Sequence, residues 1–451
     1  MGKALTTDLY QLTMMQAFWK ADYNPYATFD YFARSMPFGS YVIVAGLEYV
    51  LDYIKELRFE NDDIAFLKSQ GFERDFLNYL EGFRFTGDVY AMLEGSIAFQ
   101  NEPMVTVKAP IMEAQLIETY LLNKMNFSTL IATKASRVAY AADGKPVVEF
   151  GLRRAHGEGY LEATRAAYIG GCQSTSNVMA GKLFGIPVAG TMAHSFVMSF
   201  DTELDAFRAY ASAYPGKSML LIDTYDTIGG AKNAIKIAKE LEAKGKKLIG
   251  IRIDSGDLLK LSSKVRKMLD DAGLNYVKIM ASGDLNEWRI RDLLKSNAPI
   301  DMFGVGTELV TGQPKAALGG IYKLSEIRKN GISKPKMKIT DDAAKSTIPG
   351  SKSVWRIIEG EKFKKDVIAL ESEEFDGLKM LVKVVENGKV ILRRESLDKI
   401  RRRVKKSFEM LPESYKSIDN AISYPIELSP KLLELKNGLE KTIYGKMRTK
   451  D

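Results

Sequence analysis

Hydrophobic and polar positions along the first hundred or so residues predict helices followed by short strands. Residues 8–20 show helical spacing behind a Thr-Thr-Asp start signal, and residues 62–82 form helical pieces. In residues 87–110, the turn formers Gly95 and Pro103 separate short apolar runs. We therefore expect residues 1–109 to form an N-terminal domain that contains a small sheet.

Beyond residue 110 the pattern changes to six short apolar segments, mostly separated by helical patterns. The predicted strands are residues 147–151, 187–191, 219–224, 248–254, 277–284 and 302–307. Near-continuous apolar strands with helix-length connections favour parallel pairing through right-handed crossovers. This alternation of strands and helices is typical of either a barrel or an open doubly wound sheet.

Each of these strands ends in a polar or glycine-rich cluster. The clusters are residues 149–154, 190–195, 223–227, 252–257, 282–284 and 304–307. In a parallel barrel all carboxyl ends meet at one rim, whereas an open sheet unites only the ends beside its switch point. Because all six strand ends carry such clusters, we expect residues 110–325 to form an α/β barrel.

The remaining residues, 326–451, have a looser pattern that predicts two hairpins, 353–368 and 378–392, followed by helical pieces. Residues 393–406 hold eight Lys or Arg among fourteen positions. Because no aromatic residues lie between these charges to stack on bases, a solvated helical face is favoured over a nucleic-acid site.

Composition narrows the class of protein. The chain has 451 residues, 45% hydrophobic and 27% charged, which excludes disorder as the dominant state and allows two domains. Lys and Arg number 65 against 57 acidic residues, a net charge of +8, which suits anionic partners from phosphates to nucleic acid without choosing among them.

The scarcity of Cys and His excludes several kinds of site. Cys172 is the single cysteine, so an intrachain disulfide, cysteine-cluster zinc sites and iron–sulfur centres are ruled out, and a reducing compartment is expected. With only His156 and His194, two-histidine zinc helices and catalytic triads are hard to build. The N-terminus lacks an apolar leader and no stretch suits a membrane span, so we expect a cytoplasmic protein without membrane contact.

Three features at the strand ends could carry phosphate chemistry. Gly306 and Thr307 offer backbone N–H groups and a hydroxyl to an anion, although the same residues could form only a tight turn. Asp223, Asp254 and Asp284 could accept from ribose hydroxyls or coordinate magnesium. The planar guanidinium groups of Arg153, Arg154 and Arg252 can each donate two hydrogen bonds to phosphate or carboxylate oxygens. Charged residues recur at successive strand ends, which argues against ordinary ion pairing as their only role.

His194 lies three residues past a predicted strand end, although a lone histidine on an apolar background is by default a hydrogen-bonded core residue. At that place its side chain would face the pocket. Asp223 from the next strand end could hold one ring nitrogen and leave the other as base or nucleophile. His156 follows an arginine pair on a predicted loop, and we expect it to be peripheral to the site.

Five motifs, taken together and in order, resemble the nicotinate phosphoribosyltransferase family. They are Thr-Asp-Leu-Tyr-Gln-Leu-Thr at 7–13, Glu-Phe-Gly-Leu-Arg-Arg at 149–154, Gly-Thr-Met-Ala-His-Ser-Phe at 190–196, Arg-Ile-Asp-Ser-Gly-Asp at 252–257 and Gly-Val-Gly-Thr-Glu-Leu-Val-Thr at 304–311. The resemblance extends from residue 8 to residue 324, whereas the C-terminal region carries little signal.

The resemblance implies an irregular α/β barrel beside an N-terminal α/β sandwich domain, which residues 326–451 partly complete before ending in a basic helical tail. It implies a homodimer, with the active site at the subunit interface, that makes nicotinate mononucleotide and pyrophosphate from nicotinate and phosphoribosyl pyrophosphate in NAD salvage. The implied cofactors are Mg²⁺ and ATP. In this family the histidine matched by His194 is phosphorylated by ATP, which makes the enzyme formally a ligase.

The resemblance also assigns roles to individual residues. Tyr10 of a partner subunit and Phe150 would sandwich the pyridine ring, while Thr191 and Arg252 would meet the nicotinate carboxylate. Arg153 would lie against the phosphoribosyl group, and Asp223 would orient His194. Asp254 and Asp284, with Gly283 beside them, would bind ribose or metal. Gly306 and Thr307 would bind the 5′-phosphate.

Two alternatives remain. A nicotinamide phosphoribosyltransferase of the same architecture would carry an acidic residue near the amide, but residues 170–177 contain none, so nicotinate is favoured. The second alternative is a nonenzymatic RNA-binding protein, which the net charge and residues 393–406 would support. This hypothesis predicts that salt weakens a complex with nucleic acid, and it does not explain the polar clusters at the strand ends.

Overall fold

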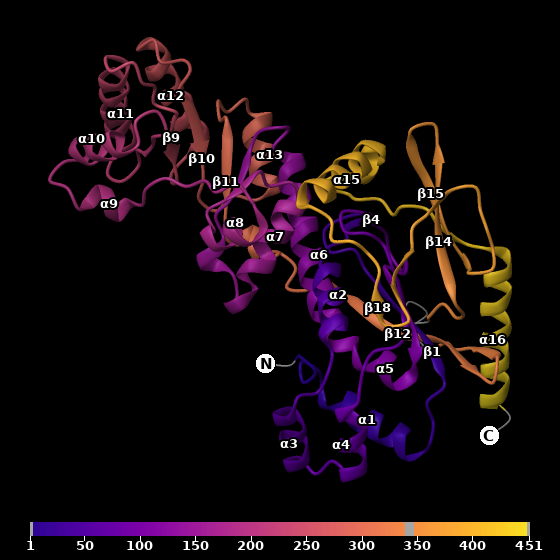
Figure 1. Ribbon diagram of the computed structural model, residues 1–451. Helices are drawn as coiled ribbons and strands as arrows, with labels where there is room; N and C mark the ends of the chain where they lie inside the picture. Colours follow the sequence, from indigo (N-terminus) through magenta and orange to yellow (C-terminus); the bar gives the residue numbers. More distant parts are fainter. Residues whose placement is uncertain (1–2, 339–346, 449–451) are drawn as a thin grey trace. The chain divides into compact units, whose positions relative to one another are not determined.

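The structure is a computed structural model that describes residues 3–338 and 347–448, with side chains described as far as residue 443. The chain forms two compact units. Residues 131–316 make up one, which we call the barrel unit, and residues 1–130 together with 317–451 make up the other, the sheet unit. Both mix helices and strands, which confirms the predicted α/β class (Figure 1).

The barrel unit is built on six parallel strands that form a curled half-barrel. The order across the sheet is β7 (Ser174–Thr175), β6 (Val147–Glu149), β11 (Met302–Val305), β10 (Lys278–Ala281), β9 (Gly250–Ile253) and β8 (Met219–Leu221). This is the chain order wound around a cylinder, with closure between β6 and β11 and with β7 and β8 as the two edges. The predicted irregular barrel is therefore confirmed, as a barrel open on one side.

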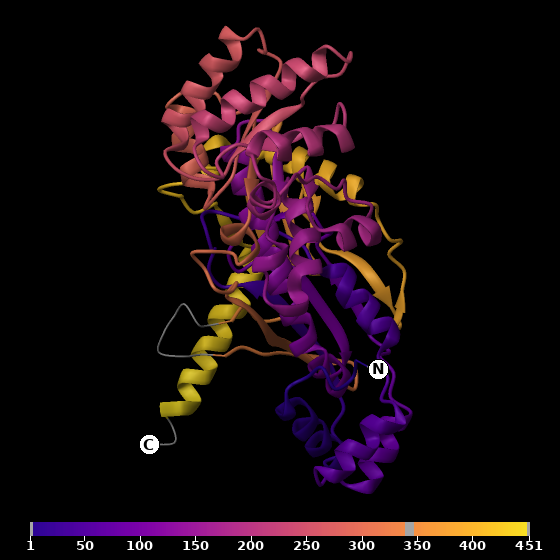
Figure 2. The same cartoon turned by 90° about the vertical axis from the view of Figure 1, so that its left-hand side faces the viewer.

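Helices of the barrel unit alternate with these strands. They are α7 (Tyr160–Gly170), α8 (Val178–Phe184), α9 (His194–Met198), α10 (Glu203–Ala213), α11 (Thr227–Glu242), α12 (Leu258–Asp271), α13 (Glu287–Lys295) and α14 (Thr307–Val310). Within this unit α10, α11 and α12 lie together beside β8–β10, as Figures 1 and 2 show.

Capping residues fix where three of these helices begin. The side chains of Asp226, Asp257 and Asn286 each accept a hydrogen bond from a backbone N–H in the first turn of the helix that follows. Gly230 lets α11 approach β8 closely, because a Cβ at this position would lie 2.1 Å from the Ile222 carbonyl oxygen. The turns between strand and helix are thus set by local chemistry.

Five of the six predicted barrel strands are present, and one is not. Residues 187–191 contribute only an isolated bridge from Val188 to Thr175, while β7 takes the neighbouring place in the sheet. The apolar pattern missed β7 because it consists of Ser174 and Thr175. Thr175 is buried because its hydroxyl donates to Glu149, not because it is apolar.

The sheet unit contains a seven-stranded antiparallel sheet and a four-stranded one. The first has the order β13 (Ile332–Pro335), β12 (Gly320–Lys329), β1 (Tyr26–Ala33), β5 (Val105–Pro110), β3 (Asp88–Ala91), β17 (Val382–Glu386) and β18 (Lys389–Val390). The second has β16 (Leu378–Lys379), β14 (Lys352–Glu359), β15 (Lys362–Leu370) and β19 (Ile426–Leu428), while β2 (Val42–Ile43) pairs with β4 (Ile97–Ala98). The expected strands within 87–110 and the two expected C-terminal hairpin regions are present.

Helices share one hydrophobic core with the seven-stranded sheet of this unit. They include α1 (Leu9–Lys20), α2 (Leu47–Glu56), α3 (Asn61–Ser69), α4 (Arg74–Glu81), α5 (Ile111–Leu116) and the first part of α6 (Glu118–Ala141). One face of β1, with Phe29 and Tyr31, is buried in this core. The helices expected at 8–20 and 62–82 are confirmed as α1, α3 and α4.

The compact units divide the chain differently from the expected boundaries at 109/110 and 325/326. Helix α5 stays with the sheet unit because it packs on α1, β1 and β5, and β12 stays because it pairs with the whole of β1. Strands β17 and β18 extend the same sheet beyond β3. The N- and C-terminal regions therefore form one unit, and the barrel unit begins within α6.

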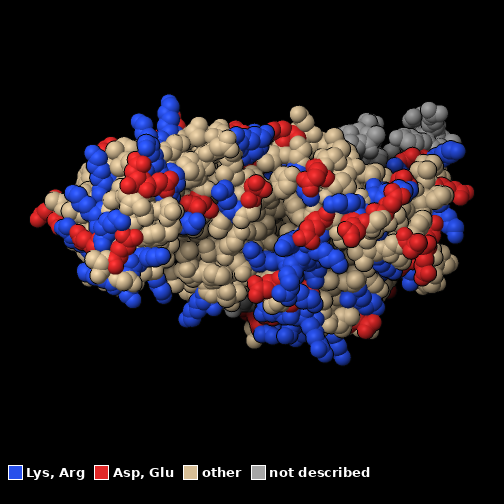
Figure 3. Space-filling model, turned by 90° about the horizontal axis from the view of Figure 1, so that it is seen from above, with Lys and Arg blue, Asp and Glu red and all other residues tan. Residues whose placement is uncertain are grey.

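The basic segment 393–406 leads into and forms most of α15 (Leu397–Met410), whose Ile400 and Val404 are buried. Glu395 pairs with Lys399 and Arg403, and Arg394 pairs with Glu48 and Asp52. Figure 3 shows Lys and Arg side chains mixed with acidic ones on the face viewed from above. These contacts agree with a solvated helical face.

Within the two described stretches of the chain, no helix combines the length and the apolar character needed to cross a bilayer.

Candidate functional site

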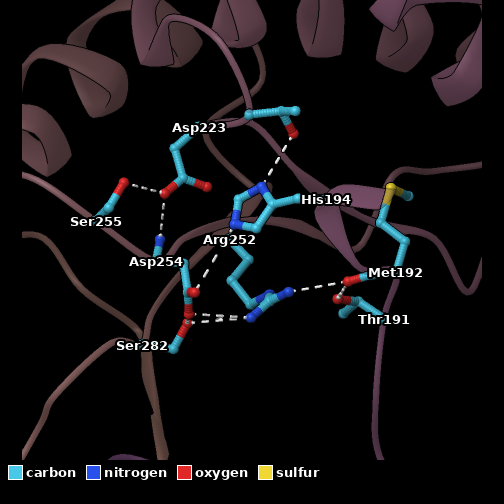
Figure 4. A network of polar contacts seen from close by, with 9 residues as sticks. Thr191, Met192, His194, Asp223, Arg252, Asp254, Ser255 and Ser282 are labelled. Atoms are coloured by element: carbon cyan, nitrogen blue, oxygen red, sulfur yellow. Dashed lines mark hydrogen bonds and ion pairs between the residues drawn. The ribbon is translucent and has the colours of Figure 1, made fainter. Parts of the chain in front are cut away.

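Polar side chains from the ends of three neighbouring strands lie close together in the barrel unit (Figure 4). Asp223 comes two residues after β8, Asp254 directly follows β9, and Ser282 directly follows β10. Because these strands are parallel and adjacent, their carboxyl ends lie at one edge. The structure thus brings together groups that are far apart in the sequence.

Arg252, on β9, is the centre of this network. One guanidinium nitrogen donates to Asp254 Oδ1 at 3.2 Å and to Ser282 Oγ at 3.3 Å, and the other donates to the Met192 carbonyl oxygen at 2.9 Å. Burial lowers the pKa of Arg252, and Asp254 opposes this shift. Its Nε is buried and has no hydrogen-bond partner among the described residues, so one donor remains for a ligand.

His194 begins α9 and places its two ring nitrogens in different surroundings. Nδ1 lies 3.2 Å from the Thr224 hydroxyl, and Nε2 lies 3.9 Å from Asp254 Oδ2. The side chain is partly exposed, at 41%. His194 is therefore not a fully buried core residue, the usual role of a lone histidine on an apolar background. Thr224 was not singled out in the sequence.

Asp223 contacts the chain after β9 instead of His194. Its Oδ2 accepts from the backbone N–H of Asp254 at 3.0 Å and from the Ser255 hydroxyl at 2.6 Å. No hydrogen bond or ion pair joins it to His194 in the part of the chain that the structure describes. Its Oδ1 is buried without a partner there, which leaves an acceptor for a hydroxyl or a cation.

Phe150 follows β6 and lies close to the Arg252 guanidinium, whose central carbon is 5.9 Å from the ring centroid. Its backbone N–H donates to the Val305 carbonyl oxygen at 2.8 Å. Gly304 makes room for the ring, because a Cβ there would lie 2.6 Å from two ring atoms. An aromatic face and a guanidinium are therefore adjacent.

A buried carboxylate holds the turn on which Phe150 sits. Glu149 is 1% exposed and accepts from the Thr175 hydroxyl at 2.6 Å, from the Thr164 hydroxyl at 3.1 Å, and from the Gly151 backbone N–H. Burial raises the pKa of Glu149, and the three hydrogen bonds oppose that shift. Glu149 belongs to the motif at 149–154, but no pattern in the sequence assigned it a role.

The other expected site residues occupy the same set of loops. Arg153 is exposed on a short 3₁₀ turn (Leu152–Arg154), and Thr191 donates to the Met192 carbonyl oxygen at 3.3 Å. Gly283 has φ +88°, and a Cβ there would lie 1.9 Å from the Asp254 carbonyl oxygen. Asp284 follows with φ +47°, and Gly306 immediately precedes α14, which Thr307 begins.

Tyr10 and His156 are not among the residues of this network. Tyr10 belongs to the sheet unit, where it projects from α1 and is 47% exposed. His156 is exposed on the loop after the 3₁₀ turn. The expected second ring of an aromatic sandwich is thus not part of the barrel unit of the same chain.

A dedicated metal cage is absent among the described residues, since no three His, Cys, Asp or Glu side chains come together to hold an ion. Magnesium that arrives with substrate phosphates requires only one or two protein carboxylates. The unpartnered Oδ1 of Asp223 fits this kind of binding.

Comparison with known proteins gives consistent matches along the chain. Residues 5–126 match the nicotinate phosphoribosyltransferase N-terminal domain, residues 146–369 the nicotinate phosphoribosyltransferase family and residues 375–436 the corresponding C-terminal domain. A nicotinate phosphoribosyltransferase of Mycobacterium tuberculosis (strain ATCC 25618 / H37Rv) is 42% identical over 435 residues, 95% of this chain and 92% of that protein. One of Bacillus subtilis (strain 168) is 41% identical, with 94% and 93% covered.

Among solved structures, human nicotinic acid phosphoribosyltransferase is similar with a TM-score of 0.85 and 29% identity, covering 96% of this chain and 99% of that one. Nicotinate-nucleotide pyrophosphorylase from Pyrococcus furiosus shares the fold, with a TM-score of 0.74, 24% identity, and 90% and 96% of the two chains covered.

Proposed function

This chain belongs to the nicotinate phosphoribosyltransferase family, and from that premise we propose that it transfers the phosphoribosyl group of phosphoribosyl pyrophosphate to nicotinate. The products would be nicotinate mononucleotide and pyrophosphate. The observation that carries this proposal is the buried Nε of Arg252, unpartnered among the described residues and beside Phe150. A flat aromatic carboxylate satisfies both neighbours at once.

The nicotinate end of the site would work by holding the ring in place. Arg252 would bind the carboxylate, with Thr191 beside it, while Phe150 packs against the ring. The pyridine nitrogen is already a nucleophile, so no general base is needed for the ring. Fixing the two reactants in line can lower the barrier by about 7 kcal/mol or more.

At the ribose, the C–N bond forms as the C–O bond to pyrophosphate breaks, and the electron pair leaves with the pyrophosphate. Positive charge develops on the sugar ring, and Asp254 is the carboxylate we place toward it. Gly306 and Thr307 would hold the 5′-phosphate, and Arg153 would contact the phosphoribosyl group. These roles rest on the position of each residue on the loops that surround Arg252 and His194.

Mg²⁺ bound to the pyrophosphate would supply charge neutralisation at the leaving group. Asp223 and Asp284 are the carboxylates we propose to hold it, and the buried, unpartnered Oδ1 of Asp223 supports this choice. Gly283 and the left-handed backbone at Asp284 set the direction of the loop that carries the second carboxylate.

We also propose that ATP phosphorylates His194. The N–P bond forms as the bond between the β- and γ-phosphoryl groups breaks and ADP leaves; water later hydrolyses the phosphohistidine to inorganic phosphate. The partly exposed ring, with Thr224 on one nitrogen and Asp254 facing the other, supports such a role. A homodimer in which a second copy supplies Tyr10, and a place in NAD salvage in the cytoplasm, complete the proposal.

One assay tests the substrate. Mononucleotide formation from phosphoribosyl pyrophosphate is followed with nicotinate and with nicotinamide in parallel, with and without ATP. We expect product with nicotinate and much less with nicotinamide, because a neutral amide cannot form the ion pair that a carboxylate forms with Arg252. A preference for nicotinamide would contradict the proposed substrate, and no product from either would contradict the transferase activity itself.

A further inference from the structure

The sheet unit contains a cavity of about 530 Å³ that the proposed reaction does not use. Its lining includes residues of β1 and β12, residues of β14, β15 and β19, and Lys436 of α16 (Pro430–Arg448). This volume falls within the range of small-molecule sites, whereas the interiors of proteins rarely keep voids larger than a water molecule.

A buried ion pair forms part of the cavity wall. Lys352 Nζ lies 2.8 Å from Asp30 Oδ2, and the two side chains are only 2% and 3% exposed. Lys352 also donates to the Ile348 and Gly350 carbonyl oxygens, and Asp30 Oδ1 accepts from the Thr106 hydroxyl. Because each charge is compensated, this pair is a neutral part of the wall.

Two other lysines of the cavity lining carry positive charge that nearby carboxylates compensate only weakly. Lys323 lies opposite Asp30 in the pairing of β12 with β1, and it makes no hydrogen bond or ion pair within the described residues. Burial raises the pKa of Glu118, and the positive charge of Lys323 opposes that shift, although no ion pair joins the two side chains within the described residues. Lys436 has Glu440 at 3.9 Å, a loose pair. Ammonium groups in such positions favour an anion.

The rest of the lining suits the body of an organic molecule. Phe32, Phe99 and Tyr424 are aromatic, Ile368 and Leu428 are aliphatic, and Ser325 adds a hydroxyl. Phe99 and Tyr424 stack on each other at 3.7 Å between ring centroids, which fixes this wall. We propose that the cavity binds an aromatic organic anion of nucleotide size, with its anionic group toward Lys323 and Lys436.

Adenosine monophosphate is the probe, because it joins an aromatic base to a phosphate, and adenosine is its uncharged counterpart. Equilibrium dialysis with the full chain measures both. We expect saturable binding of adenosine monophosphate, weakened about tenfold or more in Lys323→Met and in Lys436→Met, each of which keeps much of the apolar stem. Adenosine should bind about tenfold or more weakly than the nucleotide.

Two controls separate this cavity from other sites. Lys405→Met removes an exposed positive charge on α15 and should leave binding unchanged, and so should Arg252→Ala in the barrel unit. The proposal is overturned if adenosine monophosphate does not bind at millimolar concentrations or if adenosine binds equally well. It is also overturned if binding is lost in Arg252→Ala and kept in both lysine variants. None of these outcomes bears on nicotinate transfer.

Discussion

His194 combines three features that suit transient phosphorylation. It is partly exposed, it lies at the beginning of a short helix, and its nitrogens face a hydroxyl and a carboxylate. Asp254 is shared between this histidine and Arg252, so the two side chains are coupled through one carboxylate. A change of charge on the histidine would therefore be felt at the arginine within the same network.

Labelling with ATP tests the proposed phosphohistidine. Incubation with ATP labelled in its γ-phosphate should give one acid-labile phosphate per chain, and His194→Ala should give none. Ser195→Ala is the matched control, because it changes the exposed neighbouring residue and should keep the label. Label that persists in His194→Ala would exclude this residue as the acceptor and leave the transferase proposal intact.

At the residue scale, the sequence identified most of the polar side chains that the structure brings together. The strand-end pattern pointed to Asp254 and Arg252 because parallel strands align their carboxyl ends. It also pointed to His194, although the strand expected before it, at 187–191, contributes only an isolated bridge. It could not identify Thr224 as a contact of His194, nor show that Asp223 accepts from Ser255. Such contacts depend on the path of each loop after its strand, which no periodicity in the sequence encodes.

The turn after β6 is the element on which the proposed ring site depends. The Phe150 N–H of this turn donates to the Val305 carbonyl oxygen of β11. Glu149, just before the turn, accepts from Thr164 of α7 and from Thr175 of β7. Gly304 on β11 then leaves space that Phe150 fills. Side-chain position at this turn is therefore determined by three neighbouring elements, a form of preorganisation that binding sites require.

Gly304→Ala should disturb this arrangement. The added Cβ would lie 2.6 Å from the Phe150 ring and 2.9 Å from the terminal methyl of Met280, so the ring must move. We expect the free energy of unfolding to fall by about 1–3 kcal/mol and the KM for nicotinate to rise roughly tenfold. Thermal unfolding and steady-state kinetics measure the two effects.

Gly438→Ala provides the comparison, since nothing lies within 4 Å of a Cβ at this exposed position on α16. Alanine favours a helix over glycine by about 1 kcal/mol, so this variant should be as stable as the original or slightly more stable, with unchanged kinetics. An unchanged KM for nicotinate in Gly304→Ala would contradict the place given to Phe150.

Apolar periodicity predicted those elements that are held by apolar burial. Strands β6, β8, β9, β10 and β11 and helices such as α1 were found in this way. Strand β7 was missed because a hydrogen bond to Glu149, and not apolar burial, holds Thr175 in place. The strand predicted at 187–191 was wrong, because only Val188 of this segment makes a bridge to the sheet. Pattern alone does not distinguish an apolar segment that pairs along its length from one that touches the sheet once.

At the scale of the whole molecule, the chain leaves one unit and returns to it. Strand β1 pairs with β12 from Tyr26 opposite Arg328 to Ala33 opposite Gly320, with a register shift between Thr28 and Phe29, and β3 pairs with β17. These contacts join residues about three hundred positions apart. The sequence predicted the strands of both regions, but their pairing depends on matching edges that local patterns do not specify.

This division of the chain matters for the proposed dimer. Phe150 and Arg252 belong to the barrel unit and Tyr10 to the sheet unit, where Tyr10, Leu9 and Met14 are exposed along α1 at 47%, 64% and 38%. An exposed apolar group of this kind suits an interface between subunits. If a second copy supplies Tyr10, each complete site needs residues from two chains.

Mixing two inactive variants tests this arrangement. Tyr10→Ala and Arg252→Ala should each lose most activity, and subunit exchange between them should restore about a quarter of the original activity, because half of the dimers are mixed and each holds one intact site. Phe150→Ala mixed with Arg252→Ala is the matched control: both changes lie in the barrel unit, so no intact site can form. If Tyr10 instead served the barrel unit of its own chain, the first mixture would stay as inactive as the second.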